Sequence, residues 1–106
     1  MPPLIYTIID SGQKVSGDVA LGKYPNLLSI ALPGMTSGDS YLHGSPFDTT
    51  SADFRRLGTN AGAYTQATGP GSMILMWSDQ YRTPPNLRFE SLVAQADVRT
   101  LVFHVR

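Results

Sequence analysis

The sequence has 106 residues, 42% of them hydrophobic and only 15% charged, and its eight basic residues balance its eight acidic ones. This length predicts one domain over residues 1–106, and the scattered charges argue against a nucleic-acid partner, which needs clustered cations. The absence of cysteine excludes disulfides and thiolate metal sites. No apolar run reaches the roughly 18–20 residues that span a bilayer, and the start lacks the basic region of a signal peptide. We therefore expect a cytoplasmic product with no membrane partner.

Short segments bounded by glycine and proline make up the first half of the chain. The first, Leu4–Asp10, is β-branched and aromatic. Pro2 and Pro3 precede it and cannot donate backbone hydrogen bonds, so the chain before this segment cannot lie in the middle of a sheet. We expect the strands of this half at Leu4–Asp10, Lys14–Leu21, Pro25–Leu32, Ser40–Gly44 and Asp53–Leu57. Each is short and is followed by turn residues, as the strands of a sandwich are.

The second half continues with strand patterns and has no helical stripe. Its strands are expected at Ala63–Ala67, Ser72–Trp77, Leu87–Leu92 and Val98–Val105. Ser72–Trp77 is apolar on both faces, which is typical of a central strand covered on both sides. Glu90–Arg99 could form at most a turn or so of helix. About eight or nine short strands with regular turns predict an all-β fold, an antiparallel β-sandwich that is jelly-roll-like.

The predicted core consists of the large apolar residues of the clearest strands, because such residues are the ones most often buried. They are Leu28, Ile30, Ile74, Leu75, Phe89, Leu101 and Phe103. Less than about a tenth of the residues is expected in helix.

Residues that could support catalysis or metal binding are few and scattered. His43 and His104 are the only histidines, and a triad built from His43 and Asp48 lacks the nucleophile motif that would support it. The aspartates fall near turns, where their side chains bond the backbone, and none forms the dense alternating run of a calcium loop. The turn at residues 69–72 lacks the Lys-Ser/Thr of a phosphate-binding loop. We expect no catalytic residues, no cofactor, no metal and no enzyme activity.

Contact with other proteins is the function that the composition favours. A surface with few charges loses little hydration on association, and exposed aromatic patches commonly mark contacts. The candidate interface residues are Leu4, Ile5, Tyr6, Tyr24, Met35, Tyr41, Phe47, Trp77, Tyr81 and Arg82. For the group of Trp77, Tyr81 and Arg82, interface contact ranks first, core packing of the tryptophan second and stacking on a sugar ring third.

The first nine residues form a candidate N-terminal arm. Leu4–Ile9 is apolar enough to add onto the sheet edge of a neighbouring subunit. The alternative is an ordinary edge strand within its own domain, and the sequence leaves both alternatives open.

An ordered series of short motifs covers nearly the whole chain. The motifs are Ile8-Ile9-Asp10-Ser11-Gly12, Val19-Ala20-Leu21-Gly22-Lys23-Tyr24, Leu28-Ser29-Ile30-Ala31-Leu32-Pro33, Leu42-His43-Gly44-Ser45, Phe54-Arg55-Arg56-Leu57, Leu87-Arg88-Phe89-Glu90-Ser91 and Arg99-Thr100-Leu101-Val102-Phe103. In this order they resemble a family of small tailed-phage virion proteins with a jelly-roll-like sandwich. Two positions depart from the family pattern. Met35-Thr36 stands where the family has Trp-Thr, and Pro46-Phe47-Asp48-Thr49 replaces an Asp-Gly turn.

The resemblance implies a structural role in a phage particle and brings no catalytic residues. A capsid-decorating (cement) role comes first, with the major capsid protein or other virion proteins as partners. The form expected on the capsid is a homo-oligomer, for which a trimer on a threefold position is favoured. The alternatives are a neck, tail or fibre-base protein, or a glycan-binding module for host recognition. The implied location is the virion, assembled in the host cytoplasm.

Overall fold

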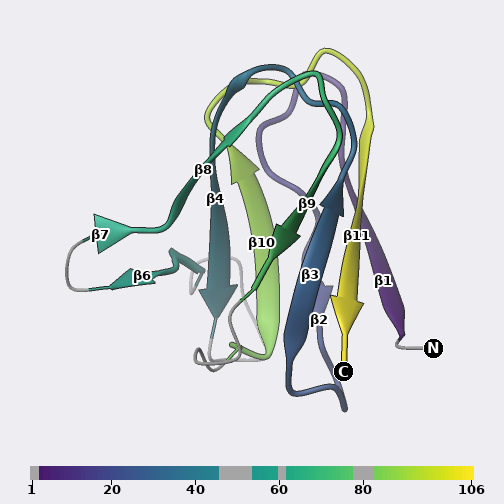
Figure 1. Cartoon of the computed structure of the whole chain (residues 1–106), viewed down its shortest axis with the longest axis vertical. Helices are drawn as coiled ribbons and strands as arrows, with labels where there is room; N and C mark the ends of the chain where they lie inside the picture. Colours follow the sequence, from purple (N-terminus) through teal and green to yellow (C-terminus); the bar gives the residue numbers. More distant parts are fainter. Residues whose placement is uncertain (1–2, 46–53, 60–61, 78–82) are drawn as a thin grey trace.

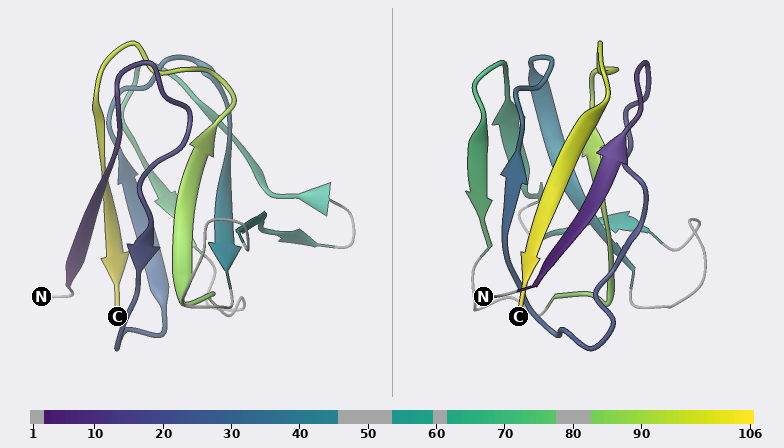
Figure 2. Two further views of the ribbon diagram at one scale, coloured as in Figure 1. Left: turned by 180° about the vertical axis from the view of Figure 1, so that it is seen from behind. Right: turned by 90° about the vertical axis from the view of Figure 1, so that its right-hand side faces the viewer.

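The computed structural model describes residues 3–45, 54–59, 62–77 and 83–106, and this part of the chain contains strands and no helix (Figure 1). The strands are β1 (Leu4–Ile9), β2 (Val19–Ala20), β3 (Leu27–Leu32), β4 (Gly38–Ser45), β5 (Arg55–Arg56), β6 (Gly58–Thr59), β7 (Gly62–Ala63), β8 (Thr65–Thr68), β9 (Met73–Met76), β10 (Asn86–Ser91) and β11 (Arg99–Val105). The two main sheets are antiparallel and lie face to face (Figure 2). The predicted all-β sandwich is confirmed.

The order of the strands in the sheets is that of a jelly roll. One sheet runs β1-β11-β3-β9, and the other runs β2-β10-β4, with β8 and β5 both paired to the remaining edge of β4. Strands that follow one another along the chain therefore lie in different sheets. This holds for β1 and β2, β3 and β4, β8 and β9, and β10 and β11. These eight strands form the wound sandwich. The short strands β6 and β7 pair with each other in a separate hairpin outside it (Figure 1).

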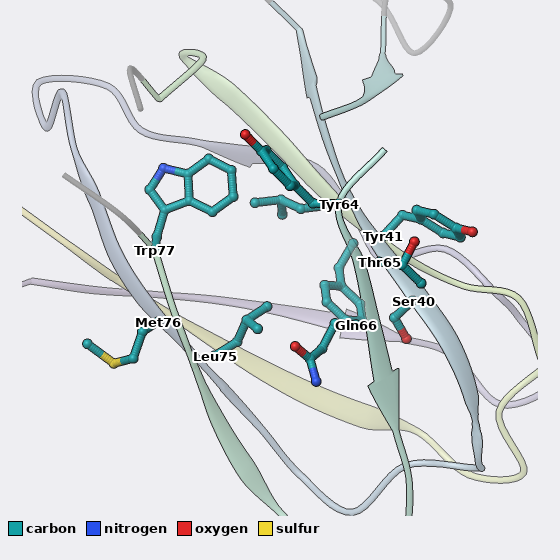
Figure 3. A pocket seen from close by; sticks show the side chains of 10 residues that line it. Ser40, Tyr41, Tyr64, Thr65, Gln66, Leu75, Met76 and Trp77 are labelled. Carbon is teal, nitrogen blue, oxygen red and sulfur yellow. The ribbon is translucent and has the colours of Figure 1, made fainter. Parts of the chain in front are cut away.

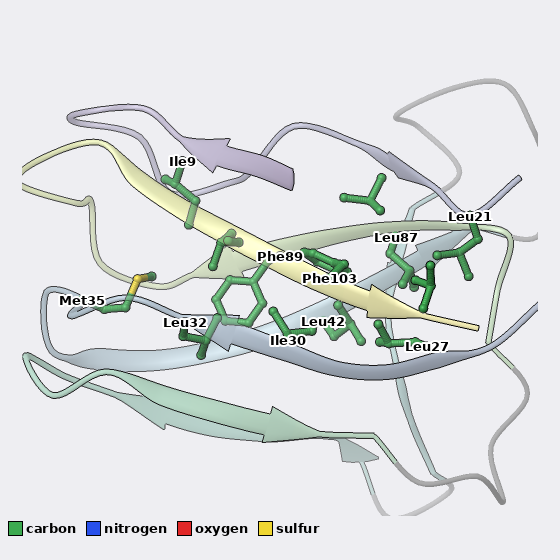
Figure 4. Close-up of a cluster of buried hydrophobic side chains, with 13 residues drawn as sticks. Ile9, Leu21, Leu27, Ile30, Leu32, Met35, Leu42, Leu87, Phe89 and Phe103 are labelled. Carbon is green, nitrogen blue, oxygen red and sulfur yellow. The ribbon is translucent and has the colours of Figure 1, made fainter. Parts of the chain in front are cut away.

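The core lies between the sheets, where alternate residues of each long strand point inward. In β11, Leu101, Phe103 and Val105 are buried, and the residues between them face outward. Thirteen buried hydrophobic side chains form one cluster (Figure 4). They are Ile9, Val19, Leu21, Leu27, Ile30, Leu32, Met35, Leu42, Leu87, Phe89, Leu101, Phe103 and Val105. The period of two in the sequence thus produces a continuous core between the two sheets.

Most of the predicted core is confirmed, and one residue of it is wrong. Ile30, Phe89, Leu101 and Phe103 are buried, and Leu28 and Leu75 are partly buried. Ile74, by contrast, is 67% exposed. The reason is the position of β9, which is an edge strand of its sheet and whose outer face is covered by no strand of the described residues. The segment 72–77 is therefore not a central strand covered on both sides, although its sequence is apolar on both faces.

The N-terminal strand is an edge strand of its own domain. β1 pairs with β11 from Leu4 opposite His104 to Ile9 opposite Arg99, and the carbonyl of Pro3 accepts a hydrogen bond from the Val105 N–H at 3.1 Å. Within one chain, β1 thus has the position expected of an ordinary edge strand, and its exchange with a neighbouring subunit stays a prediction. Proline is tolerated at position 3 because it precedes the first residue of an edge strand, where a missing N–H removes only the last hydrogen bond of the ladder.

A buried glutamine organises the loop between β10 and β11. Gln95 is 1% exposed. Its Oε1 accepts from the Thr36 N–H at 2.9 Å and from Arg99 Nε at 3.2 Å, and its Nε2 donates to Ser91 Oγ and the Val93 carbonyl. Because a buried amide needs hydrogen-bond partners, these contacts fix the loop in a shape without helix. The single turn of helix considered for residues 90–99 does not form.

Candidate functional site

The outer face of the β1-β11-β3-β9 sheet is almost free of charge. The pairing registers place its outward-facing side chains in rows across the four strands. We call this set the apolar face, and its members are Leu4, Tyr6, Ile8, Ser29, Ala31, Ile74, Met76, Thr100, Val102 and His104. None of the ten is Asp, Glu, Lys or Arg, and Tyr6, Ile74 and Met76 are 63%, 67% and 73% exposed. A contiguous exposed apolar surface rimmed by polar residues is typical of a contact surface.

Two of the predicted interface residues, Leu4 and Tyr6, lie on the apolar face. Ile5 points into the sandwich and is partly buried against the core, as is Tyr24. Tyr41 lies on the opposite outer face, and Trp77 lines a pocket described below. Phe47, Tyr81 and Arg82 lie outside the described residues.

The expectation that Met35 is exposed is wrong. It is 2% exposed and belongs to the core cluster, and its N–H donates to the Gly69 carbonyl at 2.7 Å. This bond ties the turn after β3 to the turn after β8. Sequence reasoning missed Ile74 and Met76 as surface residues, because apolar side chains on both faces of segment 72–77 were interpreted as burial on both faces.

The outer face of the second sheet is charged, in contrast to the apolar face. Glu90 on β10 lies beside His43 on β4, with 2.9 Å between Glu90 Oε1 and His43 Nε2, and Arg56 Nε donates to the same oxygen at 3.0 Å. The guanidinium of Arg56 also stacks on the ring of Tyr41, 3.9 Å from its centroid. Further along β10, Arg88 pairs with the carboxylate of Asp18. These charges are largely paired within the chain, so this face is less suited to dry contact.

The contacts of Glu90 shift its pKa. Partial burial alone would raise the pKa, but the hydrogen bonds from His43 and Arg56 and the positive charge of Arg56 outweigh burial and lower it below the ordinary value of 4.5. A carboxylate with a lowered pKa stabilises the fold above the pKa of the unfolded chain, and that contribution disappears as the pH falls through the lower folded value.

We expect Glu90→Gln to lose about 1 kcal/mol of unfolding free energy at neutral pH, because a hydrogen-bonded, partly exposed ion network is lost. The difference from the unchanged protein should shrink as the pH drops below about 4.5. Urea unfolding at a series of pH values measures both quantities. Asp39→Asn, at an exposed position on the same sheet, is the control and should change little. A loss that is constant with pH would contradict the ion-network explanation.

A pocket of about 240 Å³ opens between the two sheets at the β8 and β9 edge (Figure 3). Trp77 follows β9 and faces Tyr64, which precedes β8, with the ring centroids 6.1 Å apart and the planes nearly perpendicular at 89°. Gln66 and Leu75 lie beneath the aromatic pair, and Phe89 is also part of the lining. The pocket exists because β8 and β9 are the edge strands of different sheets and are not hydrogen-bonded to each other.

The lining of the pocket is uncharged. Its residues are Ser40, Tyr41, Leu42, Tyr64, Thr65, Gln66, Leu75, Met76, Trp77 and Phe89. Several of its polar groups are already used inside the protein: Ser40 Oγ bonds Thr68 Oγ1 at 3.0 Å, and Gln66 Nε2 donates to the Ala67 carbonyl at 3.0 Å. Such a pocket suits an apolar or aromatic group better than a charged one, because burying an unpaired charge is costly.

The described residues contain no group of three or more metal-ligating side chains, and none of their elements is a helix that could cross a membrane. His43 bonds Glu90, and His104 is on the apolar face. Asp48, the other half of the triad considered for His43, lies outside the described residues.

Comparisons with known proteins give no match. No family model matches the chain, and neither a curated protein nor a solved structure is detectably similar to it. Function must therefore be argued from the fold and from the surfaces described above.

Proposed function

We propose that the protein is a structural virion protein of a phage that decorates the capsid and stabilises it by binding other protein subunits through the apolar face. The observation that carries the proposal is the charge asymmetry of the two outer faces. The apolar face exposes Tyr6, Ile74 and Met76, and none of its ten residues is Asp, Glu, Lys or Arg. The outer face of the other sheet has paired charges. Depletion of charge with aromatic and methionine side chains is the composition of an interface core.

The wound sandwich supports a particle role as well. Jelly rolls are recurrent in viral capsid proteins and in lectins, although a fold by itself does not decide function. The sequence motifs that resemble small phage virion proteins add to this. A trimer placed on a threefold position is the favoured assembly, because one decoration unit would then tie neighbouring capsomers.

The mechanism of such a protein is thermodynamic linkage. A protein that binds the assembled shell but not free subunits adds its binding free energy to the stability of the shell. Each copy need supply only a few kcal/mol, because many copies act on one particle. Apolar contact has little long-range charge to screen, so binding should weaken little with added salt.

The test compares particles with and without this protein. We expect particles that lack it to release their genome at a lower temperature, and we expect added protein to restore the loss. Light scattering together with a dye that binds released nucleic acid measures the transition. Equal heat stability in both samples would overturn the proposal.

A second candidate function is a glycan-binding module for host recognition, and the pocket beside Trp77 and Tyr64 is the observation that favours it. Aromatic side chains at a pocket can stack on the apolar face of a sugar ring. This candidate predicts that Trp77→Ala abolishes adsorption to cells without lowering particle stability. A neck, tail or fibre-base location would appear instead as loss of tails or adsorption in particles made without the protein.

A further inference from the structure

Within the described residues, no strand pairs with one edge of β9, and the residues whose backbone groups face this edge can be identified. The Trp77 N–H donates to the Leu28 carbonyl at 3.0 Å, and antiparallel ladders alternate hydrogen-bonded and non-hydrogen-bonded pairs. Residues 73, 75 and 77 therefore direct their backbone groups toward β3. Ile74 and Met76 direct theirs the other way, to a side where the described part of the chain places no strand.

The pocket lies at this open edge. Leu75 points inward and lines the pocket together with Trp77 and Phe89. In a sheet, side chains opposite one another on neighbouring strands point to the same face. A strand added along β9 would thus bond the backbone of Ile74 and Met76, and its residue opposite Leu75 would point between the sheets toward the pocket.

We propose that the free edge of β9 and the pocket between β8 and β9 form a peptide-binding site. The site takes an extended, uncharged segment of a partner protein by strand addition, and it receives one aromatic or branched aliphatic side chain of that segment. This is the mode in which backbone hydrogen bonds supply affinity and a side-chain pocket supplies specificity. The inference goes beyond shell decoration and holds whether or not the apolar face binds a capsid.

The chemistry of the site selects this occupant. The pocket lining and β9 contain no charged residue, so a charged segment would lose hydration without a compensating partner. A volume of about 240 Å³ exceeds the ~150 Å³ of an apolar cavity that holds a benzene ring. A sugar ring needs several hydrogen bonds, but the side chains of Ser40 and Gln66 already bond within the protein.

The probes are capped peptides of the form Ser-Thr-Val-Xaa-Val-Thr-Ser, with Phe, Leu, Ala or Asp at the central position. Trp77 is the only tryptophan of the chain and lines the pocket, so its fluorescence reports occupancy directly. We expect the Phe and Leu peptides to shift the emission saturably and to bind at least about tenfold more tightly than the Ala and Asp peptides. N-methylation of the peptide backbone on the side facing β9 should remove binding.

The matched variants are Ile74→Pro and Ile74→Val. Proline removes only the outward N–H, which edge strands tolerate, whereas valine keeps it. We expect Ile74→Pro to lose binding at least about tenfold and Ile74→Val to bind almost as the unchanged protein does. If Ile74→Pro does not fold, the N-methylated peptides still test the backbone bonds. Equal binding of the Phe and Ala peptides, unchanged binding after N-methylation, or a response to free monosaccharides but to no peptide would overturn the proposal.

Discussion

Phe103→Ala is expected to lose about 3–5 kcal/mol of unfolding free energy. The ring of Phe103 is completely buried, and β11 lies between β1 and β3 in the middle of its sheet. Truncation therefore leaves a cavity lined by both sheets that little rearrangement can fill. A domain of this size has about 5–15 kcal/mol in total, so the loss is a large share of its stability.

Thermal and urea unfolding followed by circular dichroism measure this loss, and the midpoint should fall by more than about 12 °C. The control is Val102→Ala at the next position, where the side chain is partly exposed on the apolar face. It removes apolar atoms from the same strand and should cost less than about 1 kcal/mol. Equal losses at the two positions would mean that Phe103 is not in the core.

Replacing both Tyr6 and Ile74 by lysine is expected to abolish binding to particles. The two positions lie in one row across the apolar face, on β1 and β9, with Ala31 and Val102 between them. An interface that covers this row would bury two unpaired ammonium groups. The dissociation constant should rise at least about 100-fold, which corresponds to about 2.8 kcal/mol.

Co-sedimentation of the variant with particles measures the loss, and thermal unfolding confirms that the fold is kept, since both side chains are mostly exposed. The control variant places lysine at Ala67, which is exposed on the charged side of the sandwich and is not part of the pocket lining. Its binding should stay within about threefold, a difference well below 1 kcal/mol. Loss of binding in the control alone would indicate that the interface lies on the outer face of the other sheet.

The class of fold was predictable from the sequence because the inward residues of β10 and β11 alternate strictly with outward ones. Phe89 and Phe103 were recognised as core by that period alone. The segment 14–21 was predicted as a whole strand, but only Val19–Ala20 forms one. The other residues of this segment contact β10 only at isolated points, such as the hydrogen bond from the Ser16 N–H to the Phe89 carbonyl at 2.8 Å.

The surfaces were less predictable than the core. An apolar strand can be central or at an edge, and only its neighbours decide, so Ile74 and Met76 could not be recognised as exposed from their own segment. Met35 follows β3 in a turn, and its burial in the core was likewise not evident from its own segment. The pocket depends on two edge strands that face each other without pairing, which no local pattern reveals. Trp77 was noticed from its residue type, but its partner Tyr64 was not.

The pairing of β1 with β11 also affects how the chain folds. Among the eleven strands of the described residues, β1 is the earliest in the sequence and pairs only with β11, the latest, so its apolar, β-prone segment is synthesised well before its partner strand. Sheets closed by such distant pairings fold slowly, in milliseconds to seconds, and unpaired strands of this kind are prone to aggregate. We infer that the yield of soluble protein depends on the speed of translation relative to folding. Slower expression at low temperature should favour it.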